Sequence, residues 1–397
     1  MIRTPVYMDN HATTRVDPRV VEAMLPFFSE TYGNAGSTTH VFGWEAKDAV
    51  DLARKTVART VAARPGEIIF TSGTTESNNL ALCGAAERYA DRGRHFVSVA
   101  TEHPSVLDPL EKLRRRGWEV TLLPVVPAPD PRAGFVEIDR LARALRDDTV
   151  LVSVMLANNE IGVVQELAEI GRLCRERGVL LHTDATQAVG KMPVNVEDLQ
   201  VDLMSFTAHK IYGPMGIGAL YVRRRRPRVR LAPIIGGGGQ ESGLRSGTLN
   251  VPGIVGFARA VELCLEAMPE EPARLRRLRD RLWAGLEDSA GGLWLNGPAP
   301  DPPEWRLPGN LNVSLAKVDG EALLLSMKDL AVSTGSACTS ADPEPSHVLR
   351  ALGLSEDATR SSVRFGLGRF TTEEEVDFAV RLVAETAARL RKMSGLG

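Results

Sequence analysis

The feature of this sequence that most constrains its fold is a regular alternation of apolar and amphipathic segments between about residues 50 and 225. Short apolar segments typical of strands occur at 67–73, 95–100, 118–125, 149–156, 179–185, 201–210 and 216–222. Amphipathic segments typical of helices lie between them at 75–91, 105–117, 137–147 and 166–178. Continuous apolar strands that are separated by helices predict a mainly parallel sheet with helices on both faces.

The pattern changes after the glycine-rich segment 233–253. Helical patterns then cover about 252–290, 320–329 and 371–393, and strand patterns cover 308–316, 330–336 and 361–368. At 397 residues the chain is longer than one typical hydrophobic core requires, so two domains are expected. We therefore predict an α/β fold with a large domain at 15–260 and a smaller α+β domain formed by 1–14 and 261–397.

The charge balance argues against two classes of partner. The formal net charge of −2 gives no general attraction for nucleic acid or anionic lipid. We interpret the arginine-rich run 223–230 as a solvated strand end or a subunit surface, because no aromatic residues interleave with it. The N-terminus has no apolar signal core, and no apolar run approaches membrane-spanning length. We expect a cytoplasmic protein that binds neither nucleic acid nor membranes.

The four cysteines are too widely spread to suggest a zinc site or a disulfide framework. Cys83, Cys174 and Cys264 lie within helical apolar patterns and are interpreted as packing residues. Cys338 instead lies among Gly, Ser, Thr, Ala and Pro in the segment 334–345, without a large apolar neighbour to bury it. A structural cysteine usually behaves as a small hydrophobe in a core. The segment is predicted to be exposed and mobile, so Cys338 needs a functional explanation.

Polar residues follow several of the predicted strands, and in open α/β sheets ligands bind beyond the carboxyl ends of the strands. Thr74 and Thr75 begin a helix, where they could hold a phosphate or simply cap the helix. Asp184 ends a strand and could anchor a turn or hold a protonated ring nitrogen, as an Asp does for pyridoxal 5′-phosphate (PLP). Lys210 precedes a glycine-rich turn and suits a Schiff-base lysine, although a solvated surface lysine is the alternative.

Two more strand ends carry side chains of this kind. His103 follows the segment 95–100, and Asn158 and Asn159 follow the segment 149–156. A lone histidine is most often structural, and that alternative stays open for His103. Taken together, a phosphate cradle, a carboxylate, an asparagine, a histidine and a lysine at successive strand ends predict a PLP site.

Several longer motifs occur in a fixed order along the chain. They are YMDNHATT, FTSGTTESNN, TEHPSVL, NNEIGVVQ, HTDATQAVGK, DLMSFTAHKIYGPMGIG, RSGT, STGSACTS and SSVRFGLGRF. With these motifs the chain resembles, from about residue 5 to 393, the cysteine desulfurases that serve iron–sulfur-cluster assembly and nitrogen fixation. These are PLP enzymes related to the class V aminotransferases. The resemblance implies the fold type I architecture and a homodimer with active sites at the subunit interface.

The resemblance also implies roles for individual residues. Lys210 would form the Schiff base with the cofactor, Asp184 would hold its ring nitrogen, and His103 would stack on the ring and assist proton transfer. Gln187 would contact the ring's phenolic oxygen, and Asn159 would contact the hydroxyl side of the ring. Together with Thr74 of the predicted cradle, Thr75, Thr207 and His209 would bind the phosphate. Thr248 of the partner subunit would complete this phosphate site.

For the reaction, the resemblance implies L-cysteine as the substrate. Arg364 and Asn34 would grip its carboxylate, and Cys338 would attack its sulfur. The substrate would leave as alanine, and the persulfide on Cys338 would pass to an acceptor or iron–sulfur scaffold protein. No intrinsic metal is expected, although Cys338 could ligate a transferred iron–sulfur cluster.

Three features depart from the usual pattern of the family. Residues 34–37 read Asn-Ala-Gly-Ser where Asn-Pro-x-Ser is usual, so the carboxylate-binding loop is expected to be less rigid. Thr207 and Ala208 replace a usual Ser-Gly but keep a hydroxyl. The sequence ends at Gly397, whereas family members dedicated to the general scaffold carry a further C-terminal segment. The acceptor is therefore left open.

Two rival functions remain at this point. A related class V aminotransferase or a selenocysteine lyase would share Lys210 and Asp184 but would not need a cysteine on a mobile segment. A sulfur-relay platform with negligible turnover would need neither of those residues, nor Arg364.

Overall fold

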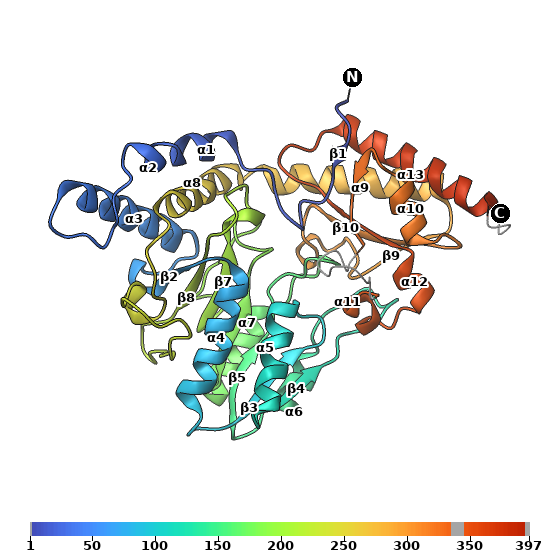
Figure 1. Cartoon of the computed structure of the whole chain (residues 1–397). Coiled ribbons are helices and arrows are strands. Elements are labelled where there is room, and N and C mark those ends of the chain that lie inside the picture. Colours follow the sequence, from blue (N-terminus) through green and yellow to red (C-terminus); the bar gives the residue numbers. More distant parts are fainter. Residues whose placement is uncertain (1, 335–344, 394–397) are drawn as a thin grey trace.

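The computed structural model describes residues 2–334 and 345–393, and its centre is a seven-stranded sheet in the order β2-β8-β7-β6-β5-β3-β4 (Figure 1). Its strands are β2 (Ile68–Thr71), β3 (His95–Val99), β4 (Glu119–Leu123), β5 (Thr149–Ser153), β6 (Leu180–Asp184), β7 (Leu203–Thr207) and β8 (Gly218–Val222). Neighbouring strands from β7 to β4 pair in parallel, and β8 runs antiparallel to β2 and β7. The predicted α/β class with a mainly parallel sheet is confirmed.

Helices cover both faces of this sheet, which explains why its strands are apolar without alternation. Ile68 and Phe70 belong to the core under α3, α7 and α8, whereas Ile69 belongs to the core under α4 and α5. Successive strand side chains point to opposite faces, so a strand covered on both sides is buried along its whole length and mainly apolar. The helices of the large sheet are α3 (Val41–Thr60), α4 (Thr74–Tyr89), α5 (Pro104–Arg115), α6 (Ile138–Ala144), α7 (Leu167–Arg177) and α8 (Val251–Ala267).

A second core lies in the C-terminal part of the chain, where three antiparallel strands in the order β12-β10-β9 pack against helices. Its elements are α9 (Glu271–Ala290), β9 (Leu293–Leu295), β10 (Asn310–Leu315), α10 (Gly320–Ser326), α12 (Glu356–Arg360), β12 (Ser362–Gly366) and α13 (Glu373–Met393). The N-terminus joins this part of the molecule, because β1 (Val6–Tyr7) pairs in parallel with β11 (Leu330–Ala331). Val6 and Met8 are buried in the same core.

The cores run close to the predicted domain boundaries but do not follow them everywhere. The long helical pattern at 252–290 is two helices: α8 packs on the large core and α9 on the small one. Helix α11 (His347–Ala351) also packs on the large core, through Val348 and Leu349, although it lies in the C-terminal range. The division at residues 14 and 260 therefore stays a prediction.

Several short or N-terminal elements have no counterpart in the sequence-based assignment. They are α1 (Pro18–Met24), α2 (Pro26–Ser29) and α3, the strands β1 and β9, the helices α11 and α12, and the 3₁₀ turns η1 (Pro65–Glu67), η2 (Ala208–Lys210), η3 (Glu241–Gly243) and η4 (Pro303–Trp305). Helices α1 to α3 lie together on the side of the molecule away from the C-terminal part (Figure 1).

The cysteines of the described chain fit the packing role that the sequence suggests. Cys174 and Cys264 are buried and Cys83 is partly buried. Burial raises the pKa of all three thiols, to about 12 for Cys174 and about 11 for Cys264, so these thiols resist forming the reactive thiolate. Among residues 2–334 and 345–393, no helix combines the length and apolar character needed to cross a membrane.

Candidate active site

A cavity of about 470 Å³ opens where the parallel strands end, the place at which open α/β sheets bind ligands. Its size falls within the ordinary range of small-molecule and cofactor sites. Most of the residues predicted from the sequence line it: Thr74, Thr75, His103, Asn159, Asp184, Gln187, Thr207, His209, Lys210 and Arg364. The fold therefore brings together, at the strand ends, predicted side chains that are up to 290 residues apart in the chain.

Lys210 reaches the cavity from the short turn η2, directly after β7. Its Nζ donates hydrogen bonds to two backbone carbonyl oxygens, those of His11 at 2.7 Å and Ala12 at 2.5 Å. The N-terminal segment therefore crosses the cavity and fixes the amine of Lys210. Two backbone carbonyl oxygens therefore orient this amine at the cavity, where a lysine suits reaction with a carbonyl compound.

Asp184 ends β6, and both of its carboxylate oxygens are held. Oδ1 accepts a hydrogen bond from the backbone N–H of Thr186 at 2.9 Å, and Oδ2 accepts one from the side-chain amide of Asn78 at 2.9 Å. Asn78 is fully buried in α4 and also donates to the hydroxyl of Ser105 at 2.9 Å. Asn78 therefore ties the carboxylate to the helix that carries His103.

His103 is the N-cap of α5, and its ring orientation is set by that role. Nδ1 accepts a hydrogen bond from the backbone N–H of Ser105 at 3.0 Å, which assigns the ring proton to Nε2. Burial lowers the pKa of the ring, and the neighbouring Asp184 carboxylate offsets only part of that effect. A neutral imidazole at the wall of the cavity can exchange a proton with a bound molecule near neutral pH.

The N-terminus of α4 forms another wall, and its geometry suits an anion. The N-cap is Gly73 at φ +152°, a residue without a side chain that could cap the helix. The first N–H groups of this 16-residue helix therefore face the cavity with the positive end of the helix dipole. Thr74 holds its place through a 2.6 Å hydrogen bond between its hydroxyl and that of Thr186.

Two other predicted phosphate ligands lie at the same wall. His209 pairs through Nδ1 with the hydroxyl of Thr13 at 3.2 Å. Burial and the charges of Lys210 and Lys191 lower the pKa of His209 to about 4, so its ring is neutral at neutral pH. Thr207 lines the cavity, but its hydroxyl donates to the carbonyl oxygen of Ile217 at 2.9 Å. The hydroxyl that Thr207 keeps is therefore already engaged with the backbone.

Arg364 lies on β12, in the C-terminal core. Of the predicted residues that the structure describes and that line the cavity, it alone comes from that core. Its side chain is 2% exposed. One guanidinium nitrogen pairs with Asp9 at 2.8 Å and another donates to the carbonyl oxygen of Asn159 at 3.2 Å. Nε is buried and has no hydrogen-bond partner in the described chain. A guanidinium that lines the cavity and is held in place by Asp9 suits a carboxylate ligand.

Two of the predicted residues that the structure describes do not line this cavity. Asn34 is exposed between α2 and α3, where its Oδ1 accepts a hydrogen bond from the N–H of Gly36 at 2.9 Å. Thr248 is exposed on the glycine-rich segment that precedes α8. Cys338 lies outside the described residues.

The sequence analysis missed several residues that shape the site: His11, Thr13, Asn78, Ser105 and Thr186. Asn78 left a usable signal, because an asparagine is disfavoured in a helix interior and needs a reason to be buried there. His11 and Thr13 belong to the motif YMDNHATT, but no periodic pattern shows that residues 9–14 cross a cavity built by strands far along the chain.

The residues present fit PLP. An amine at Lys210, a carboxylate at Asp184 and an uncapped helix N-terminus match the three polar ends of that cofactor: a carbonyl carbon, a ring nitrogen and a phosphate. The cavity is also large enough for the cofactor together with a small amino acid.

Comparison with known proteins supports the same assignment. The aminotransferase class-V family matches residues 6–378. The cysteine desulfurase IscS of Anaeromyxobacter dehalogenans (strain 2CP-C) is 56% identical over 395 residues, which cover 100% of this chain and 95% of that protein. A solved structure of a NifS-like protein, 40% identical, has a TM-score of 0.88 and covers 97% of this chain and 100% of its own. A structure of SspA in complex with cysteine, 34% identical, has a TM-score of 0.79 and covers 92% of this chain and 99% of its own. The chain therefore belongs to the class-V aminotransferase family, within its cysteine desulfurase group.

Proposed function

We propose that this protein is a PLP-dependent cysteine desulfurase that converts L-cysteine to L-alanine and carries the sulfur as a persulfide on Cys338. The observation that carries the proposal is the convergence of Lys210, Asp184, His103 and Arg364 in one cavity. Similarity to proteins named cysteine desulfurase over the whole chain, and to a structure that contains cysteine, supports the choice of substrate.

Different walls of the cavity would hold different parts of the cofactor. Lys210 would anchor it covalently, Asp184 would pair with its ring nitrogen, and the N-terminus of α4 would bind its phosphate. When bound, PLP supplies an electron sink that weakens the bonds around the α-carbon of an amino acid. Asn78 and Thr186 keep the Asp184 carboxylate oriented for that pairing.

Two further side chains would handle the amino acid itself. Arg364 would bind the substrate carboxylate, because its guanidinium lines the cavity and is preoriented by Asp9. His103, with its proton on Nε2, would move protons between the substrate and the thiol that attacks it. Asn34 does not line the cavity of its own protomer. The geometry of a single protomer therefore does not support its predicted contact with the substrate carboxylate.

The sulfur step balances without an external oxidant. The Cys338 thiolate attacks the sulfur of cysteine, so a sulfur–sulfur bond forms while the carbon–sulfur bond breaks. The carbon keeps the electron pair and takes up a proton, which gives alanine. The carbon is thereby reduced and the sulfur of Cys338 is oxidised to a persulfide. A thiol or acceptor protein then removes the outer sulfur and restores Cys338.

We further propose that the protein acts as a homodimer. Large apolar side chains on α1 to α3 and their connecting loops are exposed in one protomer, including Leu25 at 57%, Phe28 at 62% and Tyr32 at 63%. The helices that carry these side chains lie together (Figure 1), and large exposed apolar side chains gathered on neighbouring elements suggest an interaction site. Thr248 is exposed and lies away from the cavity of its own protomer, as expected for a residue that completes the phosphate site of a second copy.

The destination of the sulfur is proposed only as a class. An acceptor or scaffold protein for iron–sulfur cluster assembly is the class that the motif resemblance implies, and a cytoplasmic location is the matching expectation. A selenocysteine lyase would share the cofactor residues, but it would act on selenocysteine and leave L-cysteine unchanged.

The experiment that tests the proposal is a product assay. Purified protein that is loaded with PLP is mixed with L-cysteine and a reducing thiol, and alanine and sulfide are quantified over time. We expect equal amounts of both products, and none from Lys210→Ala. A PLP-loaded wild-type protein that releases no alanine from L-cysteine, or that releases it only from selenocysteine, would refute the proposed activity.

A further inference from the structure

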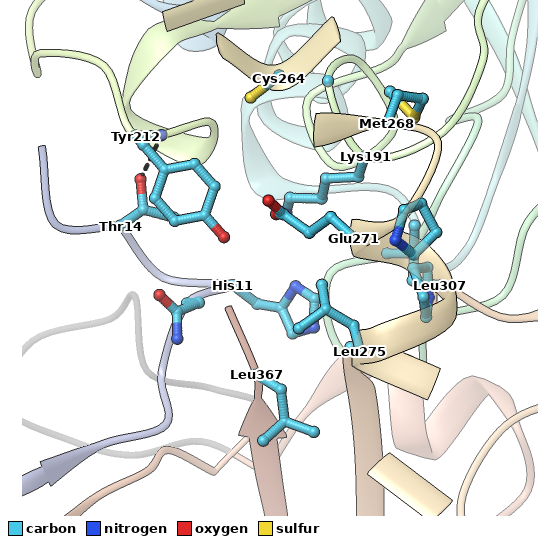
Figure 2. Close-up of a pocket in the computed structure, with 15 residues that line it drawn as sticks. His11, Thr14, Lys191, Tyr212, Cys264, Met268, Glu271, Leu275, Leu307 and Leu367 are labelled. Atoms are coloured by element: carbon cyan, nitrogen blue, oxygen red, sulfur yellow. Dashed lines mark hydrogen bonds between the residues drawn. The ribbon is translucent and has the colours of Figure 1, made fainter. Parts of the chain in front are cut away.

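A second, much smaller cavity lies directly behind the cofactor cavity. It measures about 20 Å³, which is room for about one water molecule. His11 lines both cavities and separates them. Figure 2 shows His11, Lys191 and Glu271 extending toward this small space from three separate segments. Lys191 has no place in the function described above.

Lys191 is brought to this position by a turn that strongly favours glycine. Residue 190 is a glycine at φ +77°, where side-chain-bearing residues are strained. A Cβ at this position would meet Ile211 at 2.8 Å and Cys264 at 3.3 Å. Gly190 therefore lets the chain pack against α8, and Lys191 follows directly into the small cavity.

Lys191 contacts the cofactor site through one residue, Gln187. Its Nζ donates a hydrogen bond to Gln187 Oε1 at 2.5 Å. The same oxygen pairs with His11 Nδ1 at 3.1 Å, while Gln187 Nε2 donates to the carbonyl oxygen of His11 at 2.9 Å. That carbonyl also accepts from Lys210 Nζ at 2.7 Å. A continuous chain of hydrogen bonds therefore joins Lys191 to Lys210.

The contacts of Lys191 fix which end of the Gln187 amide faces which group. Because Oε1 accepts from an ammonium and lies against a ring nitrogen, it is held on the side of the small cavity. The amide N–H₂ is then directed toward Lys210 and the cofactor cavity, which Gln187 lines. A hydrogen bond from a cation to the amide oxygen also polarises the amide and makes its N–H a stronger donor.

Resting on the proposed function, we propose that Lys191 is a positioning residue: it holds the Gln187 amide from behind so that its N–H stabilises the phenolate oxygen of bound PLP. Among the described residues, the charged and titratable groups around Lys191 are His11, Lys210, His209, Tyr212, Cys264, Glu271 and Arg364. Burial and the charge of Lys210 lower the pKa of Lys191 to about 7, so its charge responds to what the cofactor cavity holds.

The test is a pH titration of the yellow chromophore of the PLP-loaded protein. Stabilising the phenolate favours the deprotonated chromophore, so Lys191→Met is expected to raise the midpoint of this titration by about one pH unit. Lys112→Met removes an exposed lysine from α5 and is expected to leave the midpoint unchanged. Thermal unfolding of each variant is measured alongside.

A second arm separates an effect through Gln187 from a direct effect of the charge. In a Gln187→Met background, Lys191→Met should move the midpoint much less than it does in the wild type. An equal shift in both backgrounds, or a lower melting temperature without any shift, would overturn the positioning role. A wild-type protein that forms no yellow complex with PLP would refute the proposed function instead, so the two failures are distinguishable.

Discussion

Glu160 gives a prediction that does not depend on the cofactor. It follows Asn159 at the rim of the site and is 4% exposed. Its Oε2 accepts a hydrogen bond from the hydroxyl of Ser346 at 2.5 Å. Burial raises the pKa of this carboxyl from 4.5 to about 7, and the Ser346 hydrogen bond and the Arg364 charge offset only part of the rise.

The sign of the resulting pH dependence follows from the raised pKa. Below about pH 4.5 the carboxyl is protonated in both the folded and the unfolded protein, and folding costs nothing at this site. As the pH rises toward 7, the Glu160 carboxyl ionises in the unfolded chain before it does so in the folded protein. This stabilises the unfolded chain, so the free energy of unfolding falls. Above pH 7 the loss is complete, and the difference between the two pKa values corresponds to about 3 kcal/mol.

Glu160→Gln removes the ionisation and keeps an oxygen for Ser346. We expect the variant to be more stable than the wild type by about 3 kcal/mol at pH 8.5 and by less than about 1 kcal/mol at pH 5. Urea unfolding with saturating PLP, followed by tryptophan fluorescence at both pH values, measures this difference. Glu169→Gln, at an exposed position, is the matched control. A difference between wild type and Glu160→Gln that is the same at both pH values would refute the reasoning.

Four other changes test the site and the dimer. Lys210→Ala should abolish the lysine-linked yellow absorbance, and a variant that keeps the wild-type spectrum would contradict the assignment. Asn78→Ala removes the hydrogen bond to Asp184 and should weaken PLP binding by about 1.5–3 kcal/mol in an equilibrium titration, whereas unchanged binding would show that Asp184 needs no such support. Thr248→Ala should weaken PLP binding by about 1–3 kcal/mol, and a fully active wild-type monomer would exclude its role. Phe28→Glu should lower the mass measured by light scattering to that of a monomer.

The sheet could be predicted from the sequence because its strands are mainly apolar and, apart from the edge strand β4, buried at every position. Segments such as 149–156 and 201–210 carry no helical periodicity, and burial on both faces explains this. Helix α3 was not predicted, because residues such as Val41 and Trp44 on its first turn are apolar and exposed, which blurs the amphipathic pattern. Strand β1 is only two residues long, and its partner lies more than 300 residues away, beyond the reach of local patterns.

Those residues of the site that directly follow a strand could be predicted from the sequence. Asp184, His103 and Lys210 each follow a strand, and parallel strands deliver their carboxyl ends to one edge of the sheet. The contribution of His11 depends on how the N-terminal segment crosses the molecule, which is a matter of tertiary packing. Thr248 poses a different difficulty, because a residue that acts in a second copy leaves no trace in the cavity of its own chain.

The most direct test of the central claim is to locate the sulfur after a single exposure to substrate. PLP-loaded protein is mixed with L-cysteine without a reducing agent, alanine is quantified, and the peptides are analysed by mass spectrometry. The account predicts alanine in an amount equal to the active sites, and one added sulfur atom on the peptide that contains Cys338. Alanine release without sulfur on Cys338, or added sulfur on Cys83, Cys174 or Cys264 instead, would contradict it.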